Sequence, residues 1–560
     1  MADRKATPAR GSTAAPVGRS PRFLLPRASG GTRLPALPSQ PSSPVLVLDG
    51  GIRASFDGWP AAEPLDRWGQ WVAKLRPLHE PLWRELGILE GILATTYRVR
   101  RGGEGALLQL VPFWSSETNT FVFPWGEATV TLEDVAVLVG LPLAGESVRE
   151  SLSDQLQLED ERALGAVRDL LMNQSKGTGW IKYFRIRQLR RPEETTTAAA
   201  AGGRDEEQLE HGAFLSMWLS CFVLPSPSFD AVVPGEEVIP IAVRLARGRS
   251  VALAPAALAS IYSDLSALRR HFVWAKRTEA LSVSAPMHIL QLWVWERFPE
   301  LRPSAPACIP DSAGGDVPVP RAARWHDVAG RALDPGYLHA VLAAPKVFEW
   351  RPYGSRAVLP FARCLHPCEL VGMDSVEHHR PHRVARQLGF DQDVPGIVTR
   401  LNSDSWNKAW ETYDIGAGCY ASAVPSDKPG VTDEYAQWWK QYTVSCAATA
   451  AADRAATAGN RERSSRRLAQ GNTQLGSTEV CTKTHYYVSR SDRSKEAWEK
   501  DANSTGADQG FFHPKRAVGT EEMIQKASEI RQAEIAELMK NIAKLAKEIR
   551  EEEAAEALKK

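Results

Sequence analysis

The sequence has few cysteines, no long apolar run and almost no net charge. Seven cysteines are scattered over 560 residues, and their low, odd number favours a reducing compartment over a disulfide framework. No stretch of roughly 18 or more apolar residues is present, so we expect no transmembrane helix and no membrane contact. The N-terminus also lacks the apolar segment of a secretory signal.

The charge balance excludes a strongly basic protein. Lysine and arginine total 68 against 67 for aspartate and glutamate, a formal charge of +1. This argues against tight nonspecific DNA binding, because contacts to phosphates supply most of that affinity, but it leaves a local nucleic-acid contact open. No GxGxxG or GxxxxGKS/T loop and no βαβ alternation is present, so no Rossmann or P-loop nucleotide-binding domain is predicted.

The middle of the chain has the composition of a large globular body. Hydrophobic residues make up 43% of the sequence, and most of its 18 tryptophans lie in this part. Apolar residues at helical spacing predict helices over 65–75, 81–93 and 286–298. We therefore predict a mainly α fold with small β-hairpin elements, in one large helical domain over residues 45–445. Flexible insertions are expected at about 194–207 and 303–320.

The two ends differ from this body. Residues 1–44 form a basic arm, rich in proline, arginine, serine and alanine, that carries a net charge of +6 and is predicted to be disordered. The arm fits a plain linker, a nuclear or nucleic-acid contact, or an organelle transit peptide. Residues 446–518 have the composition of a low-complexity linker.

Residues 519–560 predict an amphipathic helix. The apolar side chains that define its seam are spaced 3, 4, 3, 4 along the chain: Ile535, Leu538, Ile542, Leu545 and Ile549. This is an a/d pattern over about two heptads, so self-association as a coiled coil and docking as a single helix both remain open. Glutamate and lysine mix on the other faces, which disfavours a membrane-surface helix.

The segment Phe113–Gly145 begins with a predicted β-hairpin. Alternating apolar and polar residues over 120–123 are typical of a half-buried strand. Pro124 to Gly126 then predict a turn, and residues 128–131 a second short strand.

A capped helix is predicted to follow the hairpin. Thr131 and Asp134 have the spacing of a capping box, and Glu133 adds negative charge in the first turn. Gly140 is expected to end the helix, and Pro142 blocks its continuation. The segment contains no obvious general base, nucleophile or metal-ligand set, so it indicates a folding unit.

This segment resembles a motif of the plant mobile domain family, also termed aminotransferase-like: W-x-x-E-T-x-T-F-x-x-P-x-G-E-x-T-x-T-L-E-D-V-x-x-L-x-G-L-P. The matching positions are Trp114, Glu117, Thr118, Thr120, Phe121, Pro124, Gly126, Glu127, Thr129, Thr131, Leu132, Glu133, Asp134, Val135, Leu138, Gly140, Leu141 and Pro142. Four later stretches resemble family blocks in the same order, at 213–225, 241–265, 291–303 and 380–395.

The resemblance implies a non-enzymatic protein linked to transposable elements. Family members act in the nucleus in transposon silencing, genome stability and meristem maintenance, so the chain is expected to be such a protein or a transposon-carried copy of one. Nuclear proteins are the expected partners, including a separate phosphatase-like protein, because related members are fused to or partnered with phosphatases. A nuclear location is expected, with the cytoplasm as an alternative, or an organelle if the N-terminal arm is a transit peptide.

Two enzymatic functions are the alternatives to this interpretation. Pyridoxal-phosphate chemistry needs a lysine beside a phosphate-binding loop. The core lysines lack such a context, so no cofactor is predicted. These lysines are Lys74, Lys176, Lys182, Lys276 and Lys346. A metal-dependent nuclease, transposase-related or other hydrolytic enzyme would need converging carboxylates. The available acids are Glu133, Asp134, Glu296, Asp391 and Asp393, and the last two lie in a turn-like GFDQDVPG sequence.

A zinc site is the sharper metal alternative. Cys364, Cys368, His378 and His382 have the spacing C-x3-C-x9-H-x3-H, and thiolate and imidazole are good zinc ligands. The nine-residue interval is shorter than the roughly twelve residues of a zinc finger. Ordinary buried thiols and histidines are the other interpretation, and no metal site is predicted.

The block at 380–395 is the main candidate for ligand or partner binding. Arg383 and Arg386 are three residues apart, so on a helix they share a face on which guanidinium groups bind phosphate or carboxylate. Arg380 and Gln387 belong to the same candidate surface. An internal arginine network is the alternative. Arg297 has the same two interpretations, with the adjacent Trp295 and Glu296 as partners if its role is internal.

Overall fold

The computed structural model describes most of the central body. The described residues are 24, 53–59, 65–102, 104–172, 179–189, 199–225, 233–274, 280–303, 319–328, 330–344, 348–354, 359–398, 405–415 and 425–444. Except for Leu24, the predicted arm 1–44, linker 446–518 and helix 519–560 lie outside them. The mainly α class with small β elements is confirmed. No helix in these ranges combines the length and apolar character needed to cross a bilayer.

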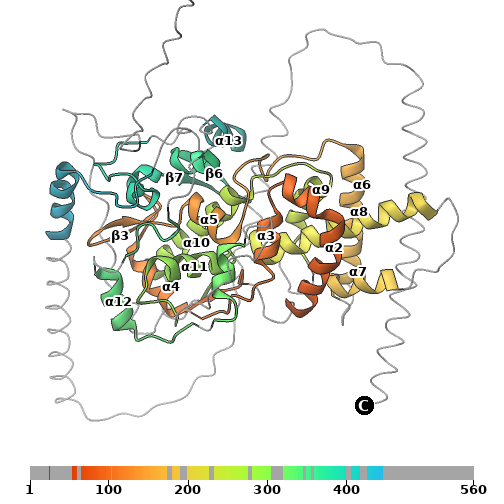
Figure 1. Ribbon diagram of the computed structural model, residues 1–560, viewed down its shortest axis with the longest axis horizontal. Helices are drawn as coiled ribbons and strands as arrows, with labels where there is room; N and C mark the ends of the chain where they lie inside the picture. The colour runs from red at the N-terminus through yellow and green to blue at the C-terminus, as the bar shows by residue number, and fades with distance from the viewer. Residues whose placement is uncertain are drawn as a thin grey trace, which may run out of the picture.

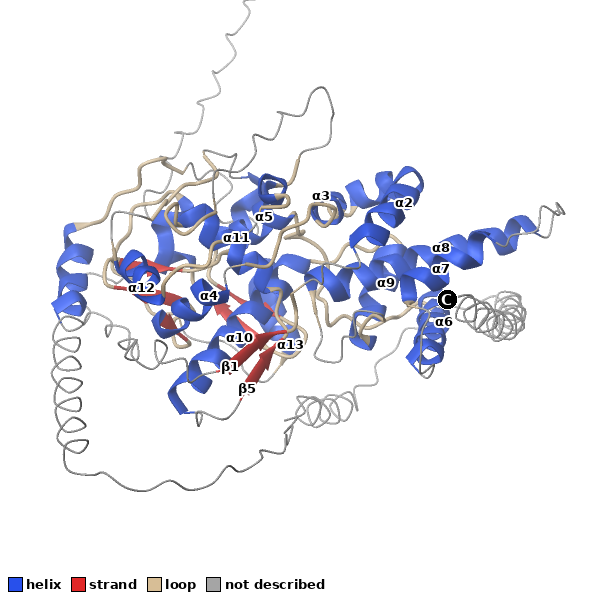
Figure 2. Ribbon diagram, turned by 90° about the horizontal axis from the view of Figure 1, so that it is seen from below, coloured by secondary structure: helices blue, strands red, loops and turns tan. Residues whose placement is uncertain are grey.

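Helices gather at one end of the molecule in both views (Figures 1 and 2). They are α2 (Leu65–Glu85), α6 (Gln155–Met172), α7 (Trp180–Leu189), α8 (Ala199–Trp218) and α9 (Ile239–Ala246). Helix α8 packs against α6, α7 and α9. It begins within the predicted insertion 194–207, where a run of alanines, the residue with the highest helix propensity, continues the helix backwards.

Helix α2 corrects the predicted helix boundaries. It runs through Pro77 and Pro81, whereas the sequence predicted separate helices over 65–75 and 81–93. The apolar face of α2, which includes the buried Trp68 and Trp83, outweighs the hydrogen bonds that the prolines remove. The break comes instead at Gly87, whose φ of 69° is left-handed, and α3 (Leu89–Ala94) follows.

The remaining helices surround the β elements at the other end (Figure 1). They are α4 (Glu104–Leu110), α5 (Leu132–Val139), α10 (Leu253–Trp274), α11 (Met287–Arg297), α12 (Pro335–Ala343) and α13 (Trp406–Ile415). Every residue of α11 is buried, as expected for a helix that is enclosed on all sides, and its bounds agree with the prediction over 286–298. Residues 433–444 are also helical.

Three small sheets complete the described secondary structure. β1 (Arg53–Phe56) pairs in parallel with β5 (Ala280–Val283), and β6 (Cys368–Val371) forms an antiparallel hairpin with β7 (Val376–His379). The third sheet has the order β2 (Trp114–Ser115), β3 (Thr120–Phe123), β4 (Gly126–Ala128). Short helical turns are η1 (Val111–Phe113), the π-helix η2 (Leu219–Val223), η3 (Glu236–Val238), η4 (Arg321–Trp325), η5 (Leu359–Leu365) and η6 (Pro381–Leu388).

The hairpin of the Phe113–Gly145 segment is more deeply buried than predicted. Strand β3 is buried on both faces, not one. Phe121 packs against Trp293 of α11, whereas Val122, on the opposite face, belongs to a buried cluster with Tyr435 and Trp438 of the helix at 433–444. The second strand of the predicted hairpin is β4, which lies earlier than the predicted 128–131.

The predicted capped helix is confirmed as α5. Thr131 is its N-cap and forms a capping box with Asp134. Gly140 ends the helix with a φ of 66°. A Cβ atom on Gly140 would lie 2.7 Å from the backbone nitrogen of Gly91, so glycine is also required for close contact with α3.

Two histidine side chains are buried on helices, His211 on α8 and His288 on α11. His211 on α8 stacks on His79 of α2 with ring centroids 3.8 Å apart, and its Nε2 accepts a hydrogen bond from the Trp83 indole. Burial lowers the pKa of His211 well below its ordinary value, and the nearby His79 lowers it further. Burial likewise lowers the pKa of His288 on α11 to about 4. Both side chains are therefore neutral in the folded protein at neutral pH.

These histidines predict a loss of stability in mild acid. In the unfolded chain each histidine takes up a proton at a pKa of about 6.5, which is above its pKa in the folded chain. The stability that comes from keeping the rings neutral is therefore fully present above about pH 6.5 and is lost as the pH falls towards 4. For His288 the loss at pH 5 is about 2 kcal/mol. Urea titration at pH 7.5 and pH 5 should therefore show a fall in the free energy of unfolding between the two pH values. This fall should be about 2 kcal/mol smaller in His288→Gln than in the unsubstituted protein. Equal losses in the two proteins would show that His288 is not held neutral.

Candidate functional site

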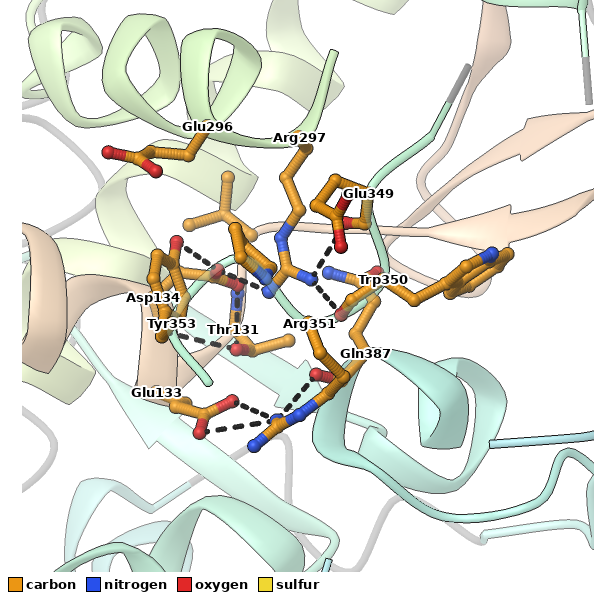
Figure 3. A network of polar contacts seen from close by, with 12 residues as sticks. Thr131, Glu133, Asp134, Glu296, Arg297, Glu349, Trp350, Arg351, Tyr353 and Gln387 are labelled. Carbon is orange, nitrogen blue, oxygen red and sulfur yellow. Dashed lines mark hydrogen bonds and ion pairs between the residues drawn. The ribbon is translucent and has the colours of Figure 1, made fainter. Parts of the chain in front are cut away.

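The most concentrated polar chemistry of the described residues is a buried network around Asp134 (Figure 3). One carboxylate oxygen of Asp134 accepts hydrogen bonds from the backbone N–H and hydroxyl of Thr131, at 2.8 and 2.7 Å. The other accepts from the Arg297 guanidinium at 2.6 Å and the Tyr353 hydroxyl at 2.8 Å. Asp134 and Arg297 have no exposed side-chain surface. The cap of α5 is therefore also half of a buried ion pair.

Arg297 connects α11 to two other parts of the chain. Besides Asp134, its guanidinium donates to the backbone carbonyl oxygens of Glu349 and Trp350. Burial lowers the pKa of Arg297. The charges of Asp134, Tyr353 and Glu133 and the hydrogen bond to Asp134 raise it, and together they leave the pKa above its ordinary value. The internal interpretation of Arg297 thus fits these contacts. Its carboxylate partner is Asp134, whereas the sequence interpretation named the neighbouring Glu296.

Glu296 is engaged in a separate ion pair next to the network. Both of its oxygens accept from Arg321, at 3.0 and 2.9 Å, and one also accepts from the Trp325 indole. Arg324 lies 3.6 Å from the same carboxylate. Glu296 therefore holds η4 against the end of α11.

Glu133 is held by a second buried arginine. The Arg351 guanidinium lies 3.2 Å from a Glu133 oxygen and also donates to the backbone carbonyls of Gln387 and Gly354. Burial raises the pKa of Glu133, and the Arg351 charge opposes that rise. The Gln387 amide in turn donates to the Thr129 carbonyl and accepts from the Thr129 N–H, both at 2.8 Å.

Of the predicted binding residues, Arg383 forms a buried ion pair. It donates to Glu127 on β4 at 2.9 Å, and the same Glu127 oxygen accepts from the Thr120 hydroxyl. Arg386 instead lies over the Trp350 ring, 3.8 Å from its centroid. The two do not form one clamp, because η6 departs from helical geometry at Val384.

Arg380 and Gln387 also contact the Phe113–Gly145 segment. Arg380 donates to the Glu117 carbonyl and approaches the His378 ring, and Gln387 bonds to Thr129 as described above. The contacts of all four predicted residues fit the internal-network alternative. An additional role in partner binding stays a prediction.

The four zinc-candidate residues lie on three different elements: Cys368 and His378 on the β6–β7 hairpin, Cys364 on η5 and His382 on η6. Cys368 is opposite His379 and Glu369 is opposite His378 in the β6–β7 register, so alternation along a strand places Cys368 and His378 on opposite faces. His378 Nε2 lies 3.2 Å from Glu369, and burial raises the pKa of the Cys364 thiol well above its ordinary value. His382 is buried on η6. Among the described residues, no group of three or more His, Cys, Asp and Glu is arranged to hold a metal ion.

The candidate nuclease acids are divided between separate interactions. Asp391 accepts from the Gly430 N–H, and Asp393 accepts from the Val394 N–H and the Thr432 hydroxyl. Only the Asp393–Val394 contact is of the predicted turn type, whereas the contacts to Gly430 and Thr432 join segments 39 residues apart. Of the candidate lysines, Lys74 is paired with Glu210, and Lys182 lies on α7. Lys176, Lys276 and Lys346 lie outside the described residues.

Sequence reasoning missed Arg351, Tyr353 and Tyr262. Tyr262 on α10 donates to the Val130 carbonyl at 2.6 Å, just before the cap of α5. Arg351 and Tyr353 follow Trp350 in irregular backbone, where no periodic pattern marks buried positions. Their only local signal is an aromatic and basic run, WRPY, in a proline-containing segment.

Chemically, the network is suited to holding segments together. Its carboxylates accept hydrogen bonds from side chains that come from distant parts of the chain, and such pairs are stable in low dielectric only when both partners are present.

The central ion pair predicts strongly non-additive stability. Arg297→Met leaves Asp134 buried without its countercharge, so the free energy of unfolding should fall by about 3–5 kcal/mol in urea titration. The double variant Asp134→Asn/Arg297→Met should cost less than the sum of the two single variants. Arg84→Met is the control, because it breaks an exposed pair with Glu80 and should cost at most about 1 kcal/mol. Additive single variants, or equal losses for Arg297→Met and Arg84→Met, would refute the ion-pair role.

Comparison with known proteins identifies relatives among plant proteins. The chain is 27% identical over 375 residues to an Arabidopsis thaliana protein named Serine/threonine-protein phosphatase 7 long form homolog. That alignment covers 60% of this chain and 26% of the relative, so the chain spans about a quarter of the relative's length. Segments of 39 residues are 59% identical to Protein MAIN-LIKE 2 and 51% identical to Protein MAINTENANCE OF MERISTEMS, both from Arabidopsis thaliana. Each covers 7% of this chain, and 6% and 8% of those proteins.

No solved structure matches the chain. The sequence profile of the plant mobile domain matches residues 87–440, which is more than half of the chain and lies within the predicted domain 45–445. Those residues include the Asp134 network and all five sequence blocks that resemble the family. The chain therefore belongs to the plant mobile domain family.

Proposed function

We propose that this chain is a non-enzymatic protein-interaction module that acts in the nucleus. Its processes are those that the family resemblance implies: transposon silencing, genome stability and meristem maintenance, in a host protein or a transposon-carried copy. The name of one relative, Protein MAINTENANCE OF MERISTEMS, supports the link to meristems.

The observation that carries the proposal is the condition of the carboxylates in the family motif. A general base or a catalytic metal ligand needs access to substrate and a lone pair that is available for chemistry. Asp134 has no exposed side-chain surface and accepts four hydrogen bonds, and Glu133 is buried against Arg351. These contacts favour a structural use of the motif, so the protein acts through its surface.

A phosphatase-like protein is the proposed partner. The relative named as a phosphatase 7 long form homolog shares the region matched here, and that region is only 26% of its length. In this proposal the present chain supplies the shared domain and works beside a separate phosphatase-like protein. Residues 519–560, outside the described ranges, are proposed to dock or self-associate.

Two measurements on the full chain test this function. Elemental analysis should find no stoichiometric metal, and affinity purification from plant nuclei should recover nuclear proteins, with fewer recovered when residues 519–560 are deleted. Stoichiometric zinc that is lost in Cys364→Ser but kept in Cys221→Ser, another buried cysteine, would overturn the prediction that the chain holds no metal. Recovery of the same partners without 519–560 would exclude that segment as the docking element.

A further inference from the structure

A cluster of arginines lies where two distant loops meet. Residues 97–102 run beside residues 326–328: the Asp327 N–H donates to the Arg98 carbonyl at 2.7 Å, and the Arg98 N–H donates to His326 Nδ1 at 3.0 Å. Gly102 and Gly330 are in such close backbone contact that a Cβ atom on Gly330 would lie 1.6 Å from the Gly102 oxygen. The loops lead into α4 and α12, which pack against each other (Figure 2). The contacts between the loops therefore hold Arg98 and Arg100 beside Asp327, with which both form ion pairs.

This cluster, which we call the arginine patch, has far more positive than negative charge. Its exposed arginines are Arg98 and Arg100, which pair with Asp327, and Arg101, which pairs with Glu104. Its other arginines are Arg321 and Arg324, which contact Glu296, and Arg302, which is near Arg324. The side chains of Arg98, Arg100 and Arg101 are 48%, 43% and 46% exposed. Arg98 and Arg100 share the single carboxylate of Asp327, at 3.7 and 2.6 Å. The shared acid therefore compensates only part of their charge.

Arg324 adds a second group of positive charge to the patch. Burial lowers its pKa, and the charges of Arg321 and Arg302 lower it further, while Glu296 opposes them. Arg321 and Arg324 are close together because both contact the Glu296 carboxylate, at 2.9 and 3.6 Å. An anion placed beside them would relieve their mutual repulsion.

Aromatic rings lie among the charges. The Tyr97 ring meets the exposed His326 ring edge to face, with centroids 5.9 Å apart, and the Arg101 guanidinium lies 5.6 Å from the Trp59 ring centroid. Tyr97 is half-buried and retains exposed surface. Exposed guanidinium groups beside ring faces are the combination that binds phosphates and unstacked bases in single-stranded nucleic acids.

We propose that the arginine patch binds single-stranded nucleic acid. Arg98, Arg100 and Arg101 contact backbone phosphates, while Tyr97 and His326 contact bases. The rings favour this ligand over an acidic peptide, for which charge alone would be sufficient. This activity goes beyond the proposed protein-interaction function and does not depend on it.

Fluorescence anisotropy of the full chain with labelled DNA and RNA single strands of about 20 nucleotides tests the proposal, since single-stranded sites span ~4–16 nucleotides. The triple variant Arg98→Gln/Arg100→Gln/Arg101→Gln should weaken binding at least about tenfold. It should also reduce the slope of log affinity against log salt by about 2. Tyr97→Leu should weaken binding roughly tenfold without changing that slope.

The matched control is Arg67→Gln/Arg76→Gln/Arg84→Gln on α2, at the other end of the molecule from α12 (Figures 1 and 2). It removes the same charge, and Arg76 and Arg84 share Glu80 as Arg98 and Arg100 share Asp327. The control should bind like the unsubstituted protein. Equal weakening in both triple variants, no loss in the patch variant, or no binding at low salt would overturn the proposal.

Two further comparisons separate a binding defect from other causes. Thermal unfolding of each variant checks the fold, and Arg98→Lys/Arg100→Lys/Arg101→Lys keeps the charge and should retain most of the affinity. If the patch-to-glutamine variant is unfolded, Tyr97→Leu and Arg100→Gln decide the question, and unchanged affinity in both contradicts the proposal. A duplex of the same length that binds as tightly as the single strand would refute the assignment to single strands.

Discussion

The buried ion pair between Asp134 and Arg297 is the interaction on which the arrangement of this domain depends. It joins residues that are 163 positions apart, at 2.6 Å, with neither side chain exposed. The same carboxylate caps α5, so the local end of a helix and a long-range contact share one group. Removing a charge from water is costly, and in this site the cost is offset by four hydrogen bonds to Asp134 and by further carbonyl contacts to Arg297.

The other polar contacts repeat this design around the Phe113–Gly145 segment. Arg383 reaches Glu127, Gln387 reaches Thr129, and Tyr262 reaches Val130. Arg383 and Gln387 belong to the family block at 380–395, and Tyr262 belongs to the block at 241–265. The segment is therefore a shared partner of elements that are distant in the sequence. The motif is therefore tied to the fold through contacts that the rest of the domain makes with it.

Local features of the fold were more predictable from the sequence than its long-range pairs. The cap at Thr131, the stop at Gly140 and the buried helix α11 follow from side-chain chemistry within a few residues. The continuation of α2 through two prolines did not, because burial of its aromatic face against other helices decides the outcome. The partner of Arg297 was also not predicted from the sequence. The sequence shows only which residues are adjacent to Arg297, whereas Asp134 becomes its neighbour in the folded chain.

The same limit explains the outcome for the metal candidates. Spacing places Cys364, Cys368, His378 and His382 in one short stretch, but strand alternation separates Cys368 from His378. Arg351 and Tyr353 had no pattern to predict them, because irregular backbone has no fixed period.

Native-state amide hydrogen exchange of Arg297→Met tests the central role of the ion pair most directly. If Asp134 and Arg297 hold the motif segment to α11, amides of α5 and α11 should lose protection together and by a similar factor. Amides of α8, at the other end of the molecule, should keep more of their protection (Figure 1). Unchanged protection in α5, or an equal loss in α5 and α8, would contradict this account.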